Sequence, residues 1–290
     1  MPSSKVITRL AQLLLTLQAL LVLTGGAVRL SGSGLGCPTW PECTSDSYTP
    51  VAGQAEGALH SWIEFGNRLL TFALFFAAVA VVIAVLRAHR RDLRLLALTQ
   101  IGGIFAQGVL GGITVLTHLN PLSVASHFLL SIALIAAAHT LVIRSEGDRI
   151  SAPQKQLAIS IHTALTFIVI VAGTLLTGAG PHAGDAAAPR LNIHIATLAA
   201  IHGFLVVALL LLTVFAIYRS SGERELQKYL IIFLAVALTQ GLIGYIQYLH
   251  GVPQLLVAAH MLGSALLWIA AWRIHLVQFY TFTTREKASQ

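Results

Sequence analysis

The chain has 290 residues, of which 56% are hydrophobic and 10% are charged, and its mean hydropathy is +0.78. These values exclude a soluble globular domain, in which roughly a quarter of the residues carry charge. The formal net charge of +7 does not indicate a nucleic-acid-binding protein, because the basic residues are divided among short segments and form no continuous patch. We therefore expect a protein embedded in a lipid bilayer.

Eight apolar stretches are long enough to cross that bilayer as helices. A membrane-spanning helix needs about 20 predominantly apolar residues, and no alternating pattern typical of strands competes with this interpretation. The predicted fold class is an all-α polytopic membrane protein with eight transmembrane helices. The expected spans are 9–28, 60–86, 93–116, 122–143, 157–177, 193–217, 228–248 and 254–276.

The basic residues lie mainly in one set of connecting segments. Fifteen of the 18 Lys and Arg residues lie at the two ends of the chain or in and beside the second, fourth and sixth connections. Only Arg29, Arg68 and Arg190 remain for the other side. Because short cytoplasmic loops are enriched in Lys and Arg, this distribution predicts cytoplasmic termini and places segments 29–59 and 178–192 outside.

The only two cysteines, Cys37 and Cys43, lie in the first outer segment. The extracytoplasmic side is oxidising, and Cys-Pro-Thr-Trp-Pro-Glu-Cys closes a small loop stiffened by proline, so a disulfide is the favoured interpretation. A pair of free structural thiols is the alternative. A zinc site is disfavoured, since two cysteines without neighbouring histidines supply only half of a tetrahedral shell.

The sequence repeats itself at the level of four spans. A Gln-Gly pair at 107–108 begins 20 residues before His127, and a second pair at 240–241 begins 20 residues before His260, which gives an offset of 133. The second span can be laid on the sixth at an offset of 135. That alignment sets Asn67 opposite His202.

A repeat of four spans has both copies entering the membrane from the same side. The repeat is therefore parallel, and we expect two four-helix bundles side by side. The N-terminal half would comprise residues 1–146, with the long outer segment, and the C-terminal half residues 147–290.

Four polar positions in the even-numbered spans match in depth. His127, His202 and His260 lie six to nine residues past the outer start of their spans, which is roughly 9–14 Å into the membrane, and Asn67 lies at the same depth. A single buried histidine is more often a hydrogen-bonded core residue. Matched depth within a repeat instead favours two sites, and facing imidazoles without carboxylate or thiolate ligands favour axial ligation of haem iron over zinc or di-iron centres.

Glu64 lies three residues before Asn67, on the same face of the second span. An ionisable group in the hydrocarbon region costs at least ~2.5–3.5 kcal/mol and usually marks a functional site. Arg68 or Arg29 is expected to compensate its charge. The same arginines could instead bind haem propionates or extend to the interface.

Five segments together resemble the bacterial haem A synthase family, and the resemblance covers essentially all eight spans. The segments are GGAVRLSGSGLGCPTWPEC, HSWIEFGNRLL, GGITVLTHLNPLSVASHFLLS, GTLLTGAGPHAGD and VAAHMLGSALLW. The resemblance implies a membrane oxidoreductase that converts the methyl group at ring position 8 of haem O to a formyl group, giving haem A. It also implies a plasma-membrane location, with haem sites toward the outer leaflet.

The resemblance further implies a division of labour between the halves. His202 and His260 would bind a resident haem b iron, which serves electron transfer, and His127 would bind the iron of the substrate haem O. Glu64 would match the family's catalytic acidic residue, and the cysteine pair belongs to the family pattern. A haem O-producing prenyltransferase and assembly factors of terminal oxidases would be partners.

One position departs from the family. The usual motif is Glu-x-x-His-Arg, whereas this chain has Asn67 between Glu64 and Arg68 at the place of the histidine. Asparagine is a poor iron ligand. We therefore expect a substrate haem held by His127 alone, with Asn67 and Arg68 among its contacts.

The residues allow two chemical roles for Glu64 and two rival functions for the protein. Glu64 could stabilise a cationic intermediate or manage the proton and water of a hydroxylation. The rival functions are a di-haem cytochrome b that passes electrons to a partner, and a haem transporter. The electron acceptor, the oxygen source and the oligomeric state, a homo-oligomer included, are not determined by the sequence.

Overall fold

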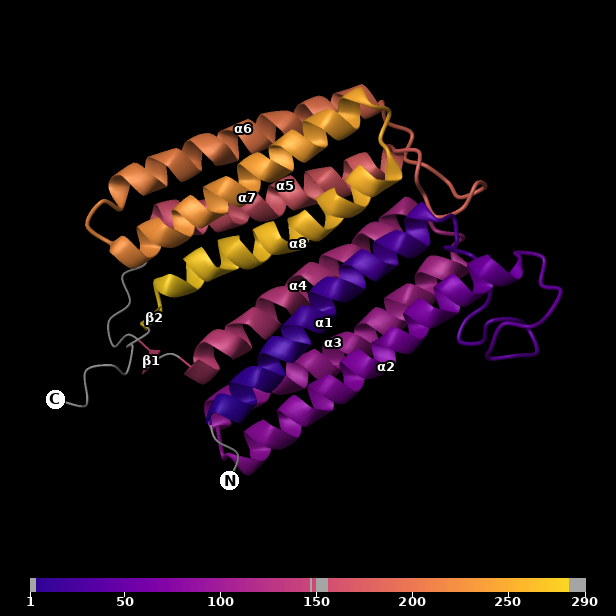
Figure 1. Ribbon diagram of the computed structural model, residues 1–290, viewed down its shortest axis with the longest axis horizontal. Helices are drawn as coiled ribbons and strands as arrows, with labels where there is room; N and C mark the ends of the chain where they lie inside the picture. The colour runs from indigo at the N-terminus through magenta and orange to yellow at the C-terminus, as the bar shows by residue number, and fades with distance from the viewer. Residues whose placement is uncertain (1–3, 147, 150–155, 282–290) are drawn as a thin grey trace.

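The computed structural model describes residues 4–146, 148–149 and 156–281, and eight long helices make up most of these ranges (Figure 1). Each is long and apolar enough to cross a membrane, which confirms the eight predicted spans to within a few residues at each end. The helices are α1 (Ser4–Leu30), α2 (Ala58–Arg87), α3 (Arg91–Leu116), α4 (Pro121–Glu146), α5 (Leu157–Ala179), α6 (Ile195–Arg219), α7 (Arg224–Leu249) and α8 (Gln254–Val277).

The helices pack as two rings of four. In the N-terminal half, α1 and α3 each contact both α2 and α4, and in the C-terminal half α5 and α7 each contact both α6 and α8. The even-numbered helices therefore stand on opposite corners of each ring. Figure 1 shows the two groups side by side, with α8 beside α1 and α4. This packing agrees with the expected pair of bundles.

Helix α8 forms the seam between the rings because it packs against α1, α4 and α5. Two of its indole groups bond to α4: Trp268 Nε1 donates to the Ile132 carbonyl at 2.8 Å, and Trp272 Nε1 donates to Thr140 Oγ1 at 2.8 Å. Trp268 is 5% exposed and belongs to the apolar core that α4 and the C-terminal half share. The seam thus combines apolar packing with satisfied indole donors.

Two short strands occur beside the helices in the described part of the chain. Strand β1 (Asp148–Arg149) pairs antiparallel with β2 (Tyr280–Thr281) and joins the connection between the halves to the segment after α8. The predicted boundary between the halves falls at this connection. Residues 147, 150–155 and 282–290 lie outside the described ranges. Three of the basic residues used above to predict the orientation, Lys155, Arg285 and Lys287, belong to these segments.

The two long connections lie at one end of the molecule, which we call the loop end. They are segments 31–57 and 180–194, and helix α1 begins at the opposite end (Figure 1). The second connection also reaches the N-terminal half, because the Gly34 N–H donates to the Gly184 carbonyl at 2.8 Å. Leu119 packs with Ala183 and Ala188 beside this contact. The loop end is therefore one continuous layer over both bundles.

Replacement of Trp268 by Phe should lower the thermal stability of the detergent-solubilised protein. The substitution keeps an aromatic ring in the seam but removes the bond to the Ile132 carbonyl, at a cost of about 1 kcal/mol. Thermal unfolding followed by fluorescence would measure the shift. The matched control is Trp62→Phe on α2, where the indole is 55% exposed and no change is expected. Equal melting temperatures for Trp268→Phe and the parent would contradict this role of the seam.

Candidate functional site

Three imidazoles and one carboxamide lie at a common level near the loop end. His127 lies six residues after the start of α4, His260 six after the start of α8, His202 seven after the start of α6, and Asn67 nine after the start of α2. At 1.5 Å per residue these offsets correspond to roughly 9–14 Å along the helices. The four side chains thus come from the four even-numbered helices, which form the opposite corners of the two rings.

Each of the three imidazoles lies against a glycine of a neighbouring odd-numbered helix. A Cβ atom added to Gly111 would lie 3.4 Å from His127 Cε1, one added to Gly173 would lie 3.1 Å from His202 Cε1, and one added to Gly244 would lie 3.2 Å from His260 Cε1. The rings therefore occupy space that a side chain would fill elsewhere in a helix.

Sequence reasoning missed these glycines, although the repeat marks two of them. Gly111 precedes His127 by 16 residues, and Gly244 precedes His260 by the same number, so both pairs share the offset of 133. The third pair does not show this spacing, because the long connection 180–194 separates Gly173 from His202 in the chain.

Each imidazole at this level has one buried ring nitrogen without a hydrogen bond, as do three histidines nearer the other end of the helices. Nδ1 of each of the three rings is buried and has no hydrogen-bond partner, and the same holds for Oδ1 of Asn67. Backbone carbonyls of α5 and α7 lie beside the rings of His202 and His260, and these two rings lie within electrostatic range of each other. Backbone carbonyls beside an imidazole are the surroundings that orient a metal-binding histidine.

On two of the even-numbered helices, the stretch at this level contains no buried residue. On α6 the buried residues Leu198 and Leu209 flank a stretch without buried residues, and His202 lies half-buried within it. On α2 no residue between Glu64 and Leu74 is buried, and Asn67 lies in this stretch. Imidazoles seated on glycines, unpaired imidazole nitrogens and incomplete burial together fit a flat iron-bearing macrocycle bound by axial histidines.

No three His, Cys, Asp or Glu side chains gather at one point among the described residues. The candidate donors are therefore single side chains projected from separate helices. Such an arrangement suits the two axial positions of a haem iron, whereas a mononuclear zinc site gathers three or four ligands around one point.

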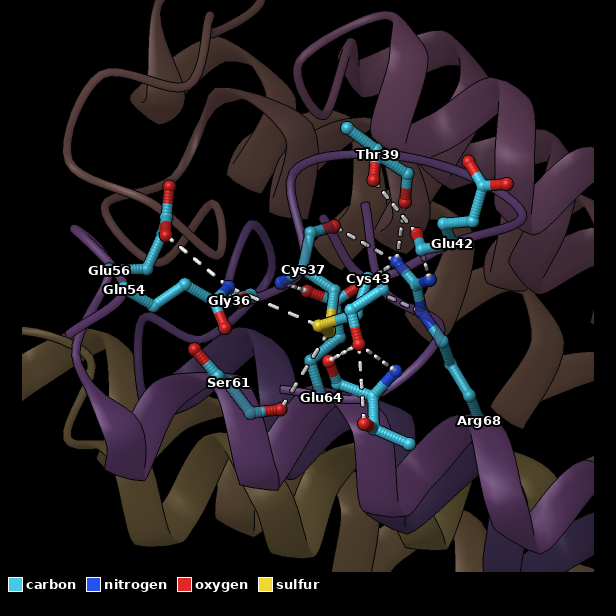
Figure 2. The surroundings of a disulfide bond; sticks show 12 residues. Gly36, Cys37, Thr39, Glu42, Cys43, Gln54, Glu56, Ser61, Glu64 and Arg68 are labelled. Carbon is cyan, nitrogen blue, oxygen red and sulfur yellow. Dashed lines mark hydrogen bonds and ion pairs between the residues drawn. A yellow bond between two sulfur atoms is a disulfide. The ribbon is translucent and has the colours of Figure 1, made fainter. Parts of the chain in front are cut away.

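Glu64 lies one turn nearer to the loop end than Asn67, is 6% exposed, and has both carboxylate oxygens bonded (Figure 2). Oε2 accepts the backbone N–H of Cys37 at 2.6 Å, and Oε1 accepts Arg68 Nη2 at 2.7 Å and Nε at 3.2 Å. The expectation that an arginine compensates this charge is met by Arg68. A charge-assisted pair of this kind is what makes a buried carboxylate tolerable in an apolar bundle.

Arg68 also binds the first connection. Its Nη2 donates to the Cys37 and Thr39 carbonyls at 2.9 and 3.1 Å, and its Nη1 donates to the Glu42 carbonyl at 3.1 Å (Figure 2). All three carbonyls belong to the loop that the predicted disulfide closes, and this disulfide is formed between Cys37 and Cys43. The guanidinium therefore holds the closed loop on α2 in addition to neutralising Glu64.

The disulfide loop also reaches across to α3. The Trp40 ring lies so close to Gly112 that a Cβ atom at this glycine would fall 2.5 Å from Trp40 Cδ2. Gly112 directly follows Gly111, which faces His127. The loop is thus anchored on α2 through Arg68 and lies against α3, so it spans the loop end of the N-terminal bundle.

Other polar candidates have structural partners. Arg29, which could have compensated Glu64, instead donates to the Thr177 carbonyl at 2.9 Å and to the His182 carbonyl, so it ties α1 to the C-terminal half. Gln107 Nε2 donates to the His127 carbonyl and to Ser131 Oγ at 3.1 and 2.7 Å. Gln107 therefore links α3 to α4 by hydrogen bonds.

Replacement of Glu64 by Ala should loosen the disulfide loop, because it removes the acceptor of the Cys37 N–H and the counter-charge of Arg68. Reduction of the Cys37–Cys43 disulfide by a membrane-impermeant phosphine, followed by maleimide labelling, should become several-fold faster in the folded protein. Glu42→Ala is the matched control, since only the Glu42 backbone carbonyl is bonded. Equal reduction rates for Glu64→Ala and the parent would contradict the anchoring role.

Comparison with known proteins adds three relatives. Each is a haem A synthase: the protein of Shewanella oneidensis is 27% identical over 184 residues, that of Geobacillus kaustophilus 31% over 106 and that of Geobacillus thermodenitrificans 31% over 157. The alignments cover 59%, 35% and 47% of this chain and 56%, 31% and 46% of the respective relatives. The chain thus matches between about a third and just over half of the length of these proteins.

A family model extends the similarity over most of the chain. The model, described as COX15-CtaA, cytochrome oxidase assembly protein, matches residues 8–272 and so includes all eight helices and the first connection with its disulfide. With this match over most of its length, the chain belongs to the COX15-CtaA family of cytochrome oxidase assembly proteins.

Proposed function

We propose that this protein is a haem A synthase, which oxidises the C8 methyl group of haem O to a formyl group through successive hydroxylations. The observation that carries the proposal is the set of four matched polar positions on opposite corners of two four-helix rings, three of them imidazoles packed on glycines. Family membership and relatives named haem A synthase support it.

The C-terminal half is proposed to hold a resident haem b. His202 and His260 would bind its iron from opposite corners of the ring, and their backbone glycine neighbours would fix the two ring planes. Bound there, haem b supplies one-electron transfer. Helices α6 and α8 would hold the two imidazoles at one level.

The N-terminal half is proposed to bind haem O, with His127 as the iron ligand. Replacing two methyl hydrogens by one oxygen is an oxidation, so a group that handles protons or stabilises positive charge near the tetrapyrrole is required. Glu64 is the only buried carboxylate of the described chain and lies one turn from Asn67. Its ion pair with Arg68 and the bond from the Cys37 N–H hold the carboxylate against the disulfide loop at the loop end of the bundle.

The proposal includes a location. The positive-inside distribution supports cytoplasmic termini and haem sites in the outer half of the bilayer. The bacterial relatives support a plasma-membrane location. Because haem O is the proposed substrate and haem A the proposed product, the proposed partners are a haem O-producing prenyltransferase and oxidase assembly factors.

Haem extraction from membranes tests the function directly. Cells that make haem O but lack their own synthase should form haem A when they express this chain. Glu64→Gln should retain haem b and accumulate haem O or an alcohol intermediate. Haem O with no haem A in the parent strain would refute the synthase. It would favour a cytochrome b if purified protein holds low-spin haem, and a transporter if it holds none.

Removal of the proposed haem b ligands should abolish the low-spin spectrum of the purified protein. His202→Ala and His260→Ala should each lose it, because one axial imidazole is gone, whereas His127→Ala should keep it. His250→Ala is the control, since this exposed histidine bonds only to the Ile246 carbonyl. A low-spin spectrum that survives either ligand substitution would overturn the assignment.

The glycine contacts give a finer test. Gly244→Ala places a methyl group 3.2 Å from His260 Cε1 and should lower haem b occupancy severalfold, because the ring must shift. Gly241→Ala on the same helix is the matched control, as nothing lies within 4 Å of its Cβ position. Haem content per protein, measured by pyridine haemochrome, reports the outcome, and equal content in the two variants would argue against the packing role.

A further inference from the structure

The two halves differ in chemistry at one of the four matched positions. In the C-terminal half both even-numbered helices present an imidazole, His202 and His260. In the N-terminal half α4 presents His127, whereas α2 presents the carboxamide of Asn67, which occupies the repeat position of His202. Helices α2 and α4 stand on opposite corners of their ring, as α6 and α8 do. The repeat therefore predicts that Asn67 faces the same site as His127.

The Asn67 carboxamide has no structural partner that would explain it. Its Oδ1 is buried and accepts no hydrogen bond. Glu64, one turn away, is already bonded to Arg68 and to the Cys37 N–H. A buried polar atom without a partner costs about 1–3 kcal/mol, and a hydrogen-bonding ligand in the site would offset that cost.

A carboxamide is not a substitute for the missing imidazole. Imidazole nitrogen suits iron, while neutral carbonyl oxygen suits harder cations such as Mg²⁺ and Ca²⁺. A carboxamide does offer two N–H donors and one acceptor oxygen. His60 does not lie at the level of the missing ligand either, because it is seven residues and about 10 Å further along α2.

We propose that Asn67 faces an open axial side of the iron in the N-terminal site and donates a hydrogen bond there to a small exogenous ligand such as water or an anion. The inference rests on the proposed function, in that His127 binds a haem iron from the other side. The N-terminal site is then one-sided and accessible, whereas the C-terminal site is closed by two imidazoles. Asn67 is thus a specificity-determining residue for the axial ligand.

A reciprocal exchange between the halves tests the open side. Purified full-length protein, loaded with protohaem and reduced, is titrated with carbon monoxide. We expect the parent to bind carbon monoxide at one haem only. Asn67→His should abolish this binding and convert the high-spin signal to low-spin, and His202→Asn should make the C-terminal haem reactive. A parent protein whose haems are all low-spin and unreactive would refute the open side.

The hydrogen bond is tested separately with fluoride, which binds ferric haem and accepts hydrogen bonds strongly. Asn67→Leu should keep carbon monoxide binding but weaken fluoride binding by about fivefold, equivalent to ~1 kcal/mol. Unchanged fluoride affinity would exclude Asn67 as the donor. The low-spin signal of the C-terminal haem, which Asn67 variants should leave intact, reports correct folding in every sample.

These measurements separate failure of the inference from failure of the proposed function. They use protohaem and do not require formation of haem A. Absence of any haem that depends on His127 would remove the N-terminal haem site and the proposed function with it. A haem that depends on His127 but has six tight ligands would leave the function standing and overturn only the role of Asn67.

Discussion

The structure depends on how one buried carboxylate is tolerated inside an apolar helix bundle. Glu64 is stabilised by an ion pair with Arg68 four residues later and by the backbone N–H of Cys37. The desolvation of such a charge is repaid only when further hydrogen bonds satisfy both partners. Here those bonds come from the loop that the disulfide closes, so the acid, the arginine and the loop form one unit at the end of the N-terminal bundle.

This unit distinguishes the two halves of the repeat. The C-terminal half has Ala199 at the repeat position of Glu64, and no disulfide closes its connection. What the halves share is the packing of an imidazole on a glycine of the adjacent helix. Shared packing and divergent polar chemistry are what a fixed cofactor site and a neighbouring substrate site would require. Only the substrate site must admit a haem, support its conversion and release the product.

The halves are also bound tightly to each other. Helix α8 bonds to α4 through two indoles, and Arg29 at the end of α1 donates to one carbonyl at the end of α5 and to one in the second connection. In a membrane, where apolar faces gain little by leaving lipid for protein, such packing and polar contacts hold helices together. The two candidate sites are therefore held at one level by the seam and by the shared layer at the loop end.

Sequence alone determined the eight helices, because the apolar length that a bilayer demands is a local property, and it determined the repeat, because offsets of 133 and 135 are counted along the chain. It also singled out Glu64, Asn67 and the three histidines, since polar groups stand out in apolar spans. Only the tertiary structure decided which partners they meet. Three kinds of contact join residues that are distant in the chain. They are the bond between Glu64 and the Cys37 N–H, the bonds from Arg29 to the C-terminal half, and the packing of the imidazoles on glycines. Such contacts depend on how helices are placed around a ring, which no periodicity within one helix encodes.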